Sequence, residues 1–370
     1  MMGILPDVAG SLRITIPQAG YLISSYALGV VVGAPTLVGL LAKRPPRSVL
    51  IWFMLMFAAF NALSAFAPNY PALMLARFLA GLPHGAFFGV GAVVAMRLAH
   101  EGRSASAVAT MFAGLTVASV LGVPFGTWLG HHVSWRLVFL IVAAIGLLTA
   151  VTLRKLVPWF EPPQRGSFRA DLRIFGRPGL WLGIAITSIG TGGFFAYLSY
   201  ITPLLTEVTG FSAETIPLIM TVVGLGMTAG VLLGGKLADR VAPAVALLVL
   251  MSTMAILLFL NGIMVHSPAA MLVLAFATGA NALALGPPIQ MLLIENSKEA
   301  EMLGSSLGQS SFNIGNALGA FLGGVPLSLG YSYVAPQWVA GCLALCGVAL
   351  VLLMLASARH PYAMKFDRVR

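Results

Sequence analysis

Charged residues are scarce in this sequence of 370 residues: Asp, Glu, Lys and Arg together make up 9% of it. A soluble domain carries about 25% charged residues, because its surface must be hydrated. Hydrophobic residues reach 59%. This balance excludes a water-soluble globular protein and indicates a polytopic membrane protein. Because the apolar runs are long and lack the alternation that a membrane β-barrel needs, the sequence predicts an all-α fold.

Cysteine is also scarce. The two residues, Cys342 and Cys346, are four positions apart in the last apolar run and share a helix face. No histidine or further cysteine lies near them in the sequence, so a metal site is not expected. The sequence also offers no paired carboxylates and no nucleophile beside a base. We therefore expect no enzyme activity, no metal and no cofactor.

Eleven apolar runs are near or above the roughly 20 residues that cross a bilayer as a helix. They predict a multi-pass membrane protein of eleven full spans. The runs cover residues 17–42, 48–67, 71–99, 104–130, 135–157, 178–206, 212–238, 243–264, 268–293, 299–329 and 333–358.

Basic residues lie almost entirely in alternate links between these runs or in the C-terminal tail. Only Arg13, Arg77 and Arg136 of the 21 Lys and Arg fall elsewhere. Cytoplasmic loops are enriched in Lys and Arg, so the basic links and the C-terminus are predicted to be cytoplasmic. The formal net charge of +10 therefore reflects topology, and nucleic-acid binding is not expected. The basic links and tail hold Lys43, Arg44, Arg47, Arg97, Arg103, Arg154, Lys155, Arg165, Arg169, Arg173, Arg177, Lys236, Arg240, Lys298, Arg359, Lys365, Arg368 and Arg370.

The chain contains an internal repeat. Residues 39–44 match residues 235–240 at an offset of 196, and residues 121–126 match residues 318–323 at an offset of 197. Shorter matches near Pro71 and Ile4 occur in the same order at 197. Four ordered matches at offsets of 196 or 197 indicate two copies of one structural unit, the plan of many secondary transporters.

The two copies flank the longest polar segment. The predicted organisation is an N-terminal helix bundle at 1–157, a cytoplasmic linker at 158–177, a C-terminal bundle at 178–358 and a cytoplasmic tail at 359–370. The run that begins near residue 178 maps back by 197 to a position before Met1. We therefore expect the first of twelve helices to be largely missing, with a remnant from Met1 to about Val8, and the natural protein to begin roughly 20 residues earlier.

Three motifs carry a family resemblance. The loop pattern G-x-L-A-D-R occurs at residues 235–240, and again at 39–44 with Lys43 in the acidic position; residues 77–91 form a glycine-rich helix that begins with Arg77. The sequence Gly122-Val-Pro124-Phe-Gly126 is the third motif. These residues resemble the major facilitator superfamily over the whole chain, and within it the twelve-helix drug:proton antiporter branch, of which arabinose-efflux-permease-like proteins look closest.

This resemblance implies two six-helix halves that rock about a central site by alternating access. It implies proton-coupled efflux of a small solute, such as a sugar or an amphipathic drug, across a bacterial inner membrane. It also identifies Gly122, Pro124 and Gly126 as an antiporter motif. Its glycines, like other small-xxx-small patterns in membrane helices, are expected to let another backbone approach closely. A monomer surrounded by lipid is expected. Two alternatives stay open: a facilitator that carries a solute down its gradient, and a transporter-like sensor that does not translocate.

Arg77 is the one basic residue well inside an apolar run. A charge at that depth costs a few kcal/mol unless it faces protein or water, so it is a candidate for function. The alternative is that its side chain reaches the interface by snorkelling. His84 is seven residues further on and shares its helix face; it can change charge near neutral pH and so carry or gate a proton, or it can be structural beside Pro83.

The end of the second-half loop motif suggests a gate. Asp239 and Arg240 lie where a helix ends at the predicted cytoplasmic face, and they can hold a neighbouring helix in one state and release it in another. The alternative is an ordinary basic loop. Gly235 belongs to the same motif. In the first half Lys43 and Arg44 occupy the equivalent places, so a weaker contact is expected there.

Polar side chains mark a second face. Gln309, Asn313 and Asn316 are spaced i, i+4 and i+7 and will not face hydrocarbon. The offset of 197 pairs the two asparagines with Thr116 and Ser119. Together with Asn281 these residues are predicted to line the translocation path; the alternative is hydrogen bonds that only hold the bundle. The pathway residues are thus Arg77, His84, Thr116, Ser119, Asn281, Gln309, Asn313 and Asn316.

Substrate and coupling are less constrained. Amides and hydroxyls suit a sugar, whereas the aromatic residues Phe87, Phe88, Phe194, Phe195 and Tyr197 suit an amphipathic drug. All eleven Asp and Glu lie near helix ends or in loops. No mid-membrane carboxylate is therefore available as a proton carrier. Both hypotheses, a proton-coupled exporter and a facilitator, stay open.

Overall fold

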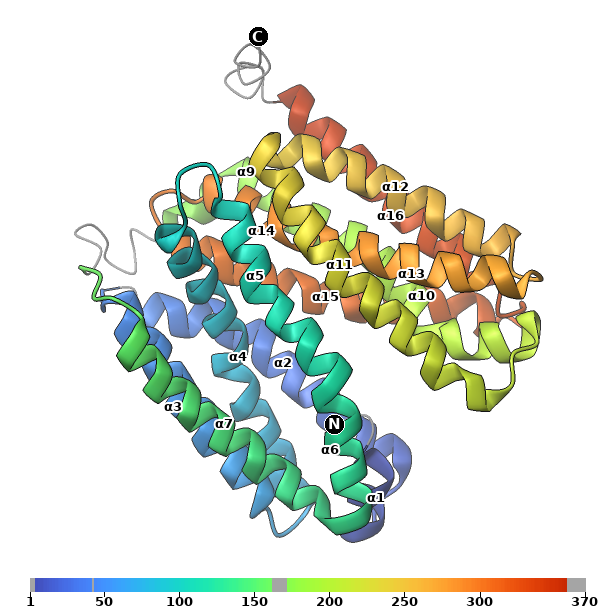
Figure 1. Ribbon diagram of the computed structural model, residues 1–370, viewed down its shortest axis with the longest axis horizontal. Helices are drawn as coiled ribbons and strands as arrows, with labels where there is room; N and C mark the ends of the chain where they lie inside the picture. The colour runs from blue at the N-terminus through green and yellow to red at the C-terminus, as the bar shows by residue number, and fades with distance from the viewer. Residues whose placement is uncertain (1–3, 42, 162–171, 358–370) are drawn as a thin grey trace. The chain divides into compact units, whose positions relative to one another are not determined.

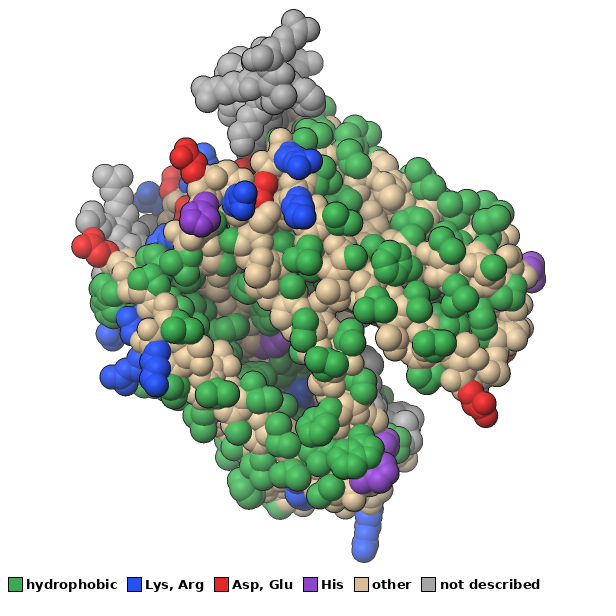
Figure 2. Space-filling view, in the orientation of Figure 1, with side chains coloured by type: hydrophobic (Ala, Val, Ile, Leu, Met, Phe, Trp, Pro, Cys, Tyr) green, Lys and Arg blue, Asp and Glu red, His purple; other side chains and the backbone are tan. Residues whose placement is uncertain are grey.

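The computed structural model describes residues 4–41, 43–161 and 172–357, and all regular elements within these ranges are helices (Figure 1). The predicted all-α fold is confirmed. Hydrophobic side chains cover much of the face shown in Figure 2. The linker residues 162–171 and the tail from 358 onward lie outside the described residues.

The helices divide between two compact units, which are described separately. One comprises residues 1–94, 118–176 and 297–310; the other comprises residues 95–117, 177–296 and 311–370. The first unit contains α1 (Leu5–Leu12), α2 (Ile16–Leu41), α3 (Pro46–Ala65), most of α4 (Tyr70–Leu98), α6 (Val123–Leu129) and α7 (Trp135–Leu156).

The second unit contains the remaining long helices. These are α5 (Ser104–Val117), α9 (Pro178–Ala185), α10 (Thr191–Pro203), α11 (Ile216–Arg240), α12 (Pro243–Ile263), α13 (Pro268–Ala284), α14 (Gly286–Glu295) and α16 (Ala335–Ser357). The helix α15 (Glu301–Ser328) contributes to both units.

Nine helical segments in the described part of the chain are long and apolar enough to cross a membrane. The sequence predicted eleven, and the difference arises at two places. Residues 104–156 form one helical segment of 53 residues that contains two predicted spans. The helix α15 carries the polar stripe of Gln309, Asn313 and Asn316 and is not among the nine.

The first described helix is α1, which extends past the expected remnant to Leu12. It ends at Arg13, whose φ of 54° is in the left-handed region and reverses the chain into α2. Ile4 and Val8 are buried in a cluster with Trp135 and Phe139 of α7. Burial of apolar area fixes this short helix to its unit.

Helix boundaries recur along the chain at the spacing of the sequence repeat. Pro46 and Pro243 begin α3 and α12, 197 residues apart, and Ser104 and Glu301 begin α5 and α15 at the same spacing. The packing recurs as well, because α3 packs on α7 and α12 packs on α16. The repeat seen in the sequence is therefore also a repeat of structure.

Glycines allow the closest helix crossings. In the first unit, Gly29 of α2 faces Gly81 of α4, and a Cβ at Gly33 would lie 2.6 Å from the carbonyl carbon of Leu82. In the second unit, Gly226, Gly230 and Gly234 of α11 meet the backbone of α13 in the same way. Small residues let membrane helices approach this closely, and van der Waals packing then holds them together.

Candidate functional site

Arg77 is buried within the first unit. It lies on α4 and is 7% exposed, so snorkelling does not describe its position. Its Cζ lies 4.2 Å from the centroid of the Tyr26 ring and 5.2 Å from that of Phe139. Its Nη1 donates a long hydrogen bond of 3.5 Å to Oδ1 of Asn61, and Nε has no partner among the described residues. Aromatic faces therefore stabilise most of this buried cation.

The same tyrosine connects Arg77 to His84. The hydroxyl of Tyr26 lies 2.7 Å from Nδ1 of His84, and the tautomer of the imidazole decides which group donates. The imidazole also packs on Phe88, with ring centroids 5.1 Å apart. The structure thus brings the two sequence-predicted residues of α4 together through a residue of α2, and we refer to Arg77, Tyr26 and His84 as the buried cluster.

The close crossing of α2 and α4 positions the buried cluster. A Cβ at Gly81 would lie 3.1 Å from Cα of Gly29 and would also meet the carbonyl oxygen of Tyr26. Ser25 adds a hydrogen bond across the crossing, donating to the carbonyl of Met74 at 2.9 Å. Because the backbones touch, the Tyr26 side chain can span from the guanidinium to the imidazole.

Sequence reasoning missed Tyr26 and Asn61, although both interrupt apolar runs with a polar side chain. Their partners lie on other helices, which a single helical face does not reveal. Asn61 is 2% exposed and donates from Nδ2 to the carbonyl of Phe57 at 2.8 Å, so its Oδ1 is left to accept from Arg77. The sequence did contain a signal for both residues, since buried polar side chains in membrane spans pair with one another and Arg77 needs such partners.

The buried cluster has the chemistry to couple charge to helix position. No carboxylate contacts the guanidinium of Arg77 in the part of the chain that the structure describes. Protonation of His84 would place a second positive charge beside the same tyrosine. Charges interact strongly where water is excluded, so a proton or an anionic group entering this region would change the forces between α2 and α4.

Asp239, in the other unit, makes a contact between helices. Its Oδ1 accepts from the backbone N–H of Ala105 at 2.8 Å, and its Oδ2 accepts from that of Ser106 at 3.0 Å. These N–H groups belong to the first turn of α5, where no intrahelical acceptor exists. The carboxylate at the end of α11 therefore caps a different helix, and the helix dipole favours its charge.

The rest of the loop motif explains why Asp239 can reach α5. Gly235 is buried, and a Cβ there would lie 2.5 Å from Cβ of Ala109. Arg240 is exposed and makes no hydrogen bond or ion pair within the described residues, so of these two charged residues only the aspartate bonds to α5. In the first half, Lys43 and Arg44 are exposed residues of the turn between α2 and α3.

The antiporter motif gives an irregular helix rather than a close crossing. Among the described atoms, nothing lies within 4 Å of a Cβ placed on Gly122, and at Gly126 only Val138 comes near, at 3.6 Å. The close backbone approach expected at Gly122 is therefore absent from the described structure. The preceding segment, Ala118–Gly122, is instead a π-helix, and Pro124 follows it. Proline cannot donate to the helix and clashes with the carbonyl four residues before it, which favours this widened turn.

The polar pathway candidates have diverse surroundings. Thr116 is buried and donates to the carbonyl of Ala113 on its own helix. Asn281 is buried and donates from Nδ2 to the carbonyl of Leu250 on α12 at 2.8 Å. A hydrogen bond that holds two helices together was the alternative to a role in the pathway. The side chain of Ser119 is outside the described part of the structure.

Exposure increases along the stripe of α15. Gln309 is 8% exposed, Asn313 is half-buried and Asn316 is exposed. The same helix is tightly packed one turn earlier, where Gly89 of α4 meets Ser306 at its Cα and Cβ. The role of these three amides in the pathway stays a prediction.

Sequence comparison provides independent information. Residues 1–308 and 201–367 match the profile of the Major Facilitator Superfamily. The inner membrane transport protein YdhP of Escherichia coli K12 is 40% identical over 365 residues, which cover 97% of this chain and 92% of that protein. The putative transporter AraJ of the same organism is 38% identical, with coverage of 90% and 86%. A chloramphenicol resistance protein of Streptomyces lividans is 30% identical, with coverage of 96% and 90%.

Solved structures support the same fold. The fucose:proton symporter FucP of Escherichia coli aligns with a TM-score of 0.76 at 17% identity, covering 95% of this chain and 93% of that one. The proton:xylose symporter XylE aligns with a TM-score of 0.75 at 15% identity, covering 96% and 90%. At sequence identities this low, the similarity to the two symporters is one of fold.

Proposed function

Since the chain belongs to the major facilitator superfamily and is a multi-pass membrane transporter rather than an enzyme, we propose that it is a proton-coupled exporter of a small solute. The observation that carries the proposal is the buried cluster. A cation, a tyrosine hydroxyl and an imidazole meet at the α2–α4 crossing, inside segments that cross the membrane. Such intramembrane ionisable groups mark ion or substrate pathways.

Proton coupling is assigned to His84 and Tyr26. Binding of a proton at His84 and departure of substrate would alternate, because both change the charge balance beside Arg77. Arg77 would attract an anionic or electron-rich part of the solute. The two crossing helices, α2 and α4, would respond by shifting relative to each other. Protonation of one side chain would in this way change the positions of two helices.

Gating at the cytoplasmic end is assigned to Asp239. Its carboxylate caps α5 in the present conformation, at the end of α11 that the positive-inside pattern predicts to be cytoplasmic. Opening of that end would require the cap to break. A contact that is made in one state and broken in the other gives the alternating-access cycle a two-state element.

The substrate class follows from the relatives and from the side chains available. The relatives include a chloramphenicol resistance protein, which favours export of an amphipathic drug, whereas the amide and hydroxyl side chains suit a sugar. The inner membrane is proposed as the location because YdhP is named an inner membrane protein. Gln309, Asn313 and Asn316 would provide hydrogen bonds to a neutral polar solute, and the aromatic residues would contact a drug.

The proposal is tested by substrate-induced proton movement in inside-out vesicles. Pentoses, thio-sugars, chloramphenicol and cationic dyes form the panel, and a pH-sensitive fluorophore reports protons leaving the vesicle as substrate enters. Proton efflux with one class of compound supports antiport and names that class. Transport of labelled substrate without any proton movement would contradict it.

A facilitator is the second candidate, because all eleven acidic residues lie near helix ends or in loops. Many proton-driven carriers use a carboxylate inside the membrane to carry the proton. A facilitator would equilibrate the solute at the same rate with and without a pH gradient. The vesicle assay separates the two when the gradient is collapsed with an ionophore.

A further inference from the structure

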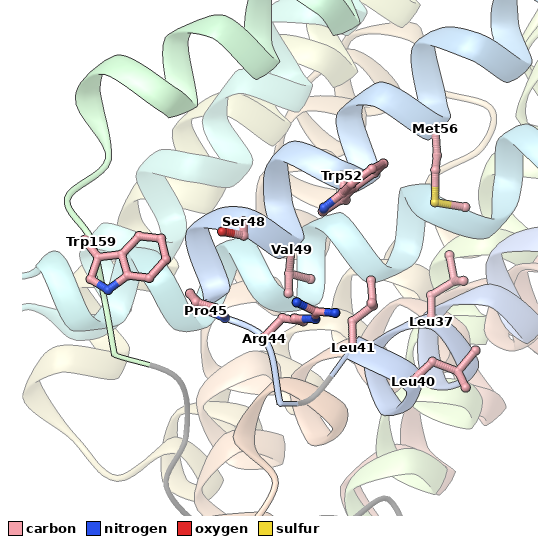
Figure 3. Close-up of a pocket in the computed structure, with 10 residues that line it drawn as sticks. All are labelled: Leu37, Leu40, Leu41, Arg44, Pro45, Ser48, Val49, Trp52, Met56 and Trp159. Carbon is pink, nitrogen blue, oxygen red and sulfur yellow. The ribbon is translucent and has the colours of Figure 1, made fainter.

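A groove lies on the first unit where α2 ends and α3 begins (Figure 3). Its cavity volume is about 730 Å³, the size that accommodates a drug-sized or lipid-sized group. Leu37, Leu40 and Leu41 of α2 form one wall, and α3 contributes Met56 deeper along the other. Leu40 is 72% exposed, so at membrane depth its side chain must be covered by hydrocarbon.

The groove has one charged lining residue, Arg44. Figure 3 shows its side chain beside Pro45 and Val49, between the two helices. Within the described residues the guanidinium makes no ion pair, and no carboxylate is among the ten residues that line the groove. Ser48 also lines the groove and supplies a hydroxyl. A cation and a hydroxyl donor above an apolar trough match a phosphate group attached to an acyl chain.

Further positive charge surrounds this end of the unit. Arg47 donates to the backbone carbonyl of Arg154, which ties the start of α3 to the end of α7, and Lys43 and Lys155 are exposed nearby in the sequence. The positive-inside pattern places this end in the cytoplasmic leaflet, where anionic lipids are concentrated.

Two tryptophans mark the level of the interface. Trp52 and Trp159 line the groove and are 60% and 61% exposed. Figure 3 shows Trp159 at the end of the groove opposite Leu37 and Leu40. Tryptophan prefers the depth of the lipid headgroups. Met56 lies eight residues beyond Ser48, about 12 Å along α3, which gives an acyl chain room to run into the hydrocarbon.

We propose that this groove binds an anionic glycerophospholipid of the cytoplasmic leaflet, with the phosphate on Arg44 and Ser48 and one acyl chain against Leu37, Leu41 and Met56. A water-soluble phosphate compound would leave the apolar wall uncovered. A zwitterionic lipid would place the positive group of its headgroup near the guanidinium of Arg44, and the two positive charges would repel each other. The site is separate from the buried cluster, so it is tested independently of proton-coupled export.

The test is native mass spectrometry of the purified full-length chain with equimolar phosphatidylglycerol and phosphatidylcholine. The wild type is expected to retain phosphatidylglycerol in preference. Arg44→Gln should lower that preference about fivefold, the effect of one basic residue near an anionic surface. Arg44→Lys should keep most of it. Lys298→Gln removes an equal charge from another exposed site predicted to be cytoplasmic, and it should change nothing.

A second measurement locates the lipid. Brominated phosphatidylglycerol should quench tryptophan fluorescence of the wild type more than brominated phosphatidylcholine does, and Trp52→Phe should reduce that difference. Thermal unfolding in detergent checks that each variant is folded. Equal retention of both lipids, an equal loss in Lys298→Gln, or displacement of the lipid by millimolar glycerol phosphate would overturn the proposal.

Discussion

At the scale of single residues, the position of Arg77 shows how a buried charge is tolerated. Two aromatic faces and one long hydrogen bond to Asn61 surround it, without a carboxylate in the described residues. Such a site is costly, since removing a cation from water is only partly offset by cation–π contacts. The cost favours a role in function over one in stability.

The hydroxyl of Tyr26 tests the buried cluster. Tyr26→Phe keeps the ring under Arg77 but removes the hydrogen bond to His84, so substrate-driven proton movement should fall at least about tenfold, as when a positioned proton-transfer group is lost. Detergent-solubilised stability should change by about 1 kcal/mol, the contribution of one hydrogen bond. Tyr21→Phe, on the same helix at a residue that is 58% exposed, is the matched control and should transport normally. Unchanged proton movement in Tyr26→Phe would remove the cluster from the mechanism.

Residue-level prediction from sequence was most specific where depth alone was informative. Arg77 and His84 stood out because a charge and an imidazole in an apolar run are rare. Tyr26 was missed because its role depends on the α2–α4 crossing, which one helix cannot reveal. Asn281 shows the limit of this reasoning. Its amide lies inside a span and was therefore predicted to line the pathway, but its Nδ2 donates to the carbonyl of Leu250 on a neighbouring helix.

At the scale of helices, the glycines of α2 differ in what surrounds them. Gly33→Ala should destabilise the protein by about 1–3 kcal/mol, because the new methyl group meets the backbone of Leu82. Gly20→Ala lies on the same helix with nothing within 4 Å among the described atoms, and it should be neutral or stabilising by about 0.5–1 kcal/mol. Thermal unfolding in one detergent measures both. Equal melting temperatures would contradict the close crossing.

The cap on α5 gives a second prediction at this scale. Asp239→Asn keeps the side-chain length but loses the charge that faces the helix dipole, which contributes about 1 kcal/mol. The buried residue Val108 of α5, replaced by cysteine in a background without Cys342 and Cys346, should then react with a maleimide about fivefold faster. Lys236→Gln, an exposed neighbour on α11, should leave the rate unchanged. An unaltered rate in Asp239→Asn would show that the cap does not hold α5.

Elements were predicted well from hydrophobic length and less well from small-residue motifs. Helix boundaries followed the apolar runs to within a few residues, since a bilayer demands satisfied backbone groups. The motif around Gly122 and Pro124 was expected to pack closely and instead accompanies a π-helix. Glycine and proline permit either outcome, and only the surrounding helices decide between them.

At the scale of the whole molecule, the basic residues predict orientation. In a cysteine-free background, Lys43→Cys should be protected from a membrane-impermeant maleimide in intact cells, whereas Ser267→Cys should react. Both residues are exposed, so accessibility depends on the side of the membrane. The reverse pattern would invert the topology and move the lipid groove to the outer leaflet.

The repeat was also visible in the sequence, because four motif matches occur at offsets of 196 or 197, and the starts of α3 and α12 and of α5 and α15 are 197 residues apart. The identity of the substrate was not visible in the sequence, since Gln309, Asn313 and Asn316 would hydrogen-bond to a sugar while the aromatic residues would contact a drug. Hydrogen-bonding groups restrict the chemistry of a ligand without naming it.

The central claim is that export is driven by protons, and transport in proteoliposomes with an imposed pH gradient tests it most directly. A gradient of one pH unit sustains about tenfold accumulation for each proton exchanged. If export is driven by protons, the wild type accumulates its substrate on the acidic side, an ionophore abolishes the accumulation and Tyr26→Phe lowers its rate. Equal distribution of substrate across the membrane, reached at the same rate with and without the gradient, would contradict it.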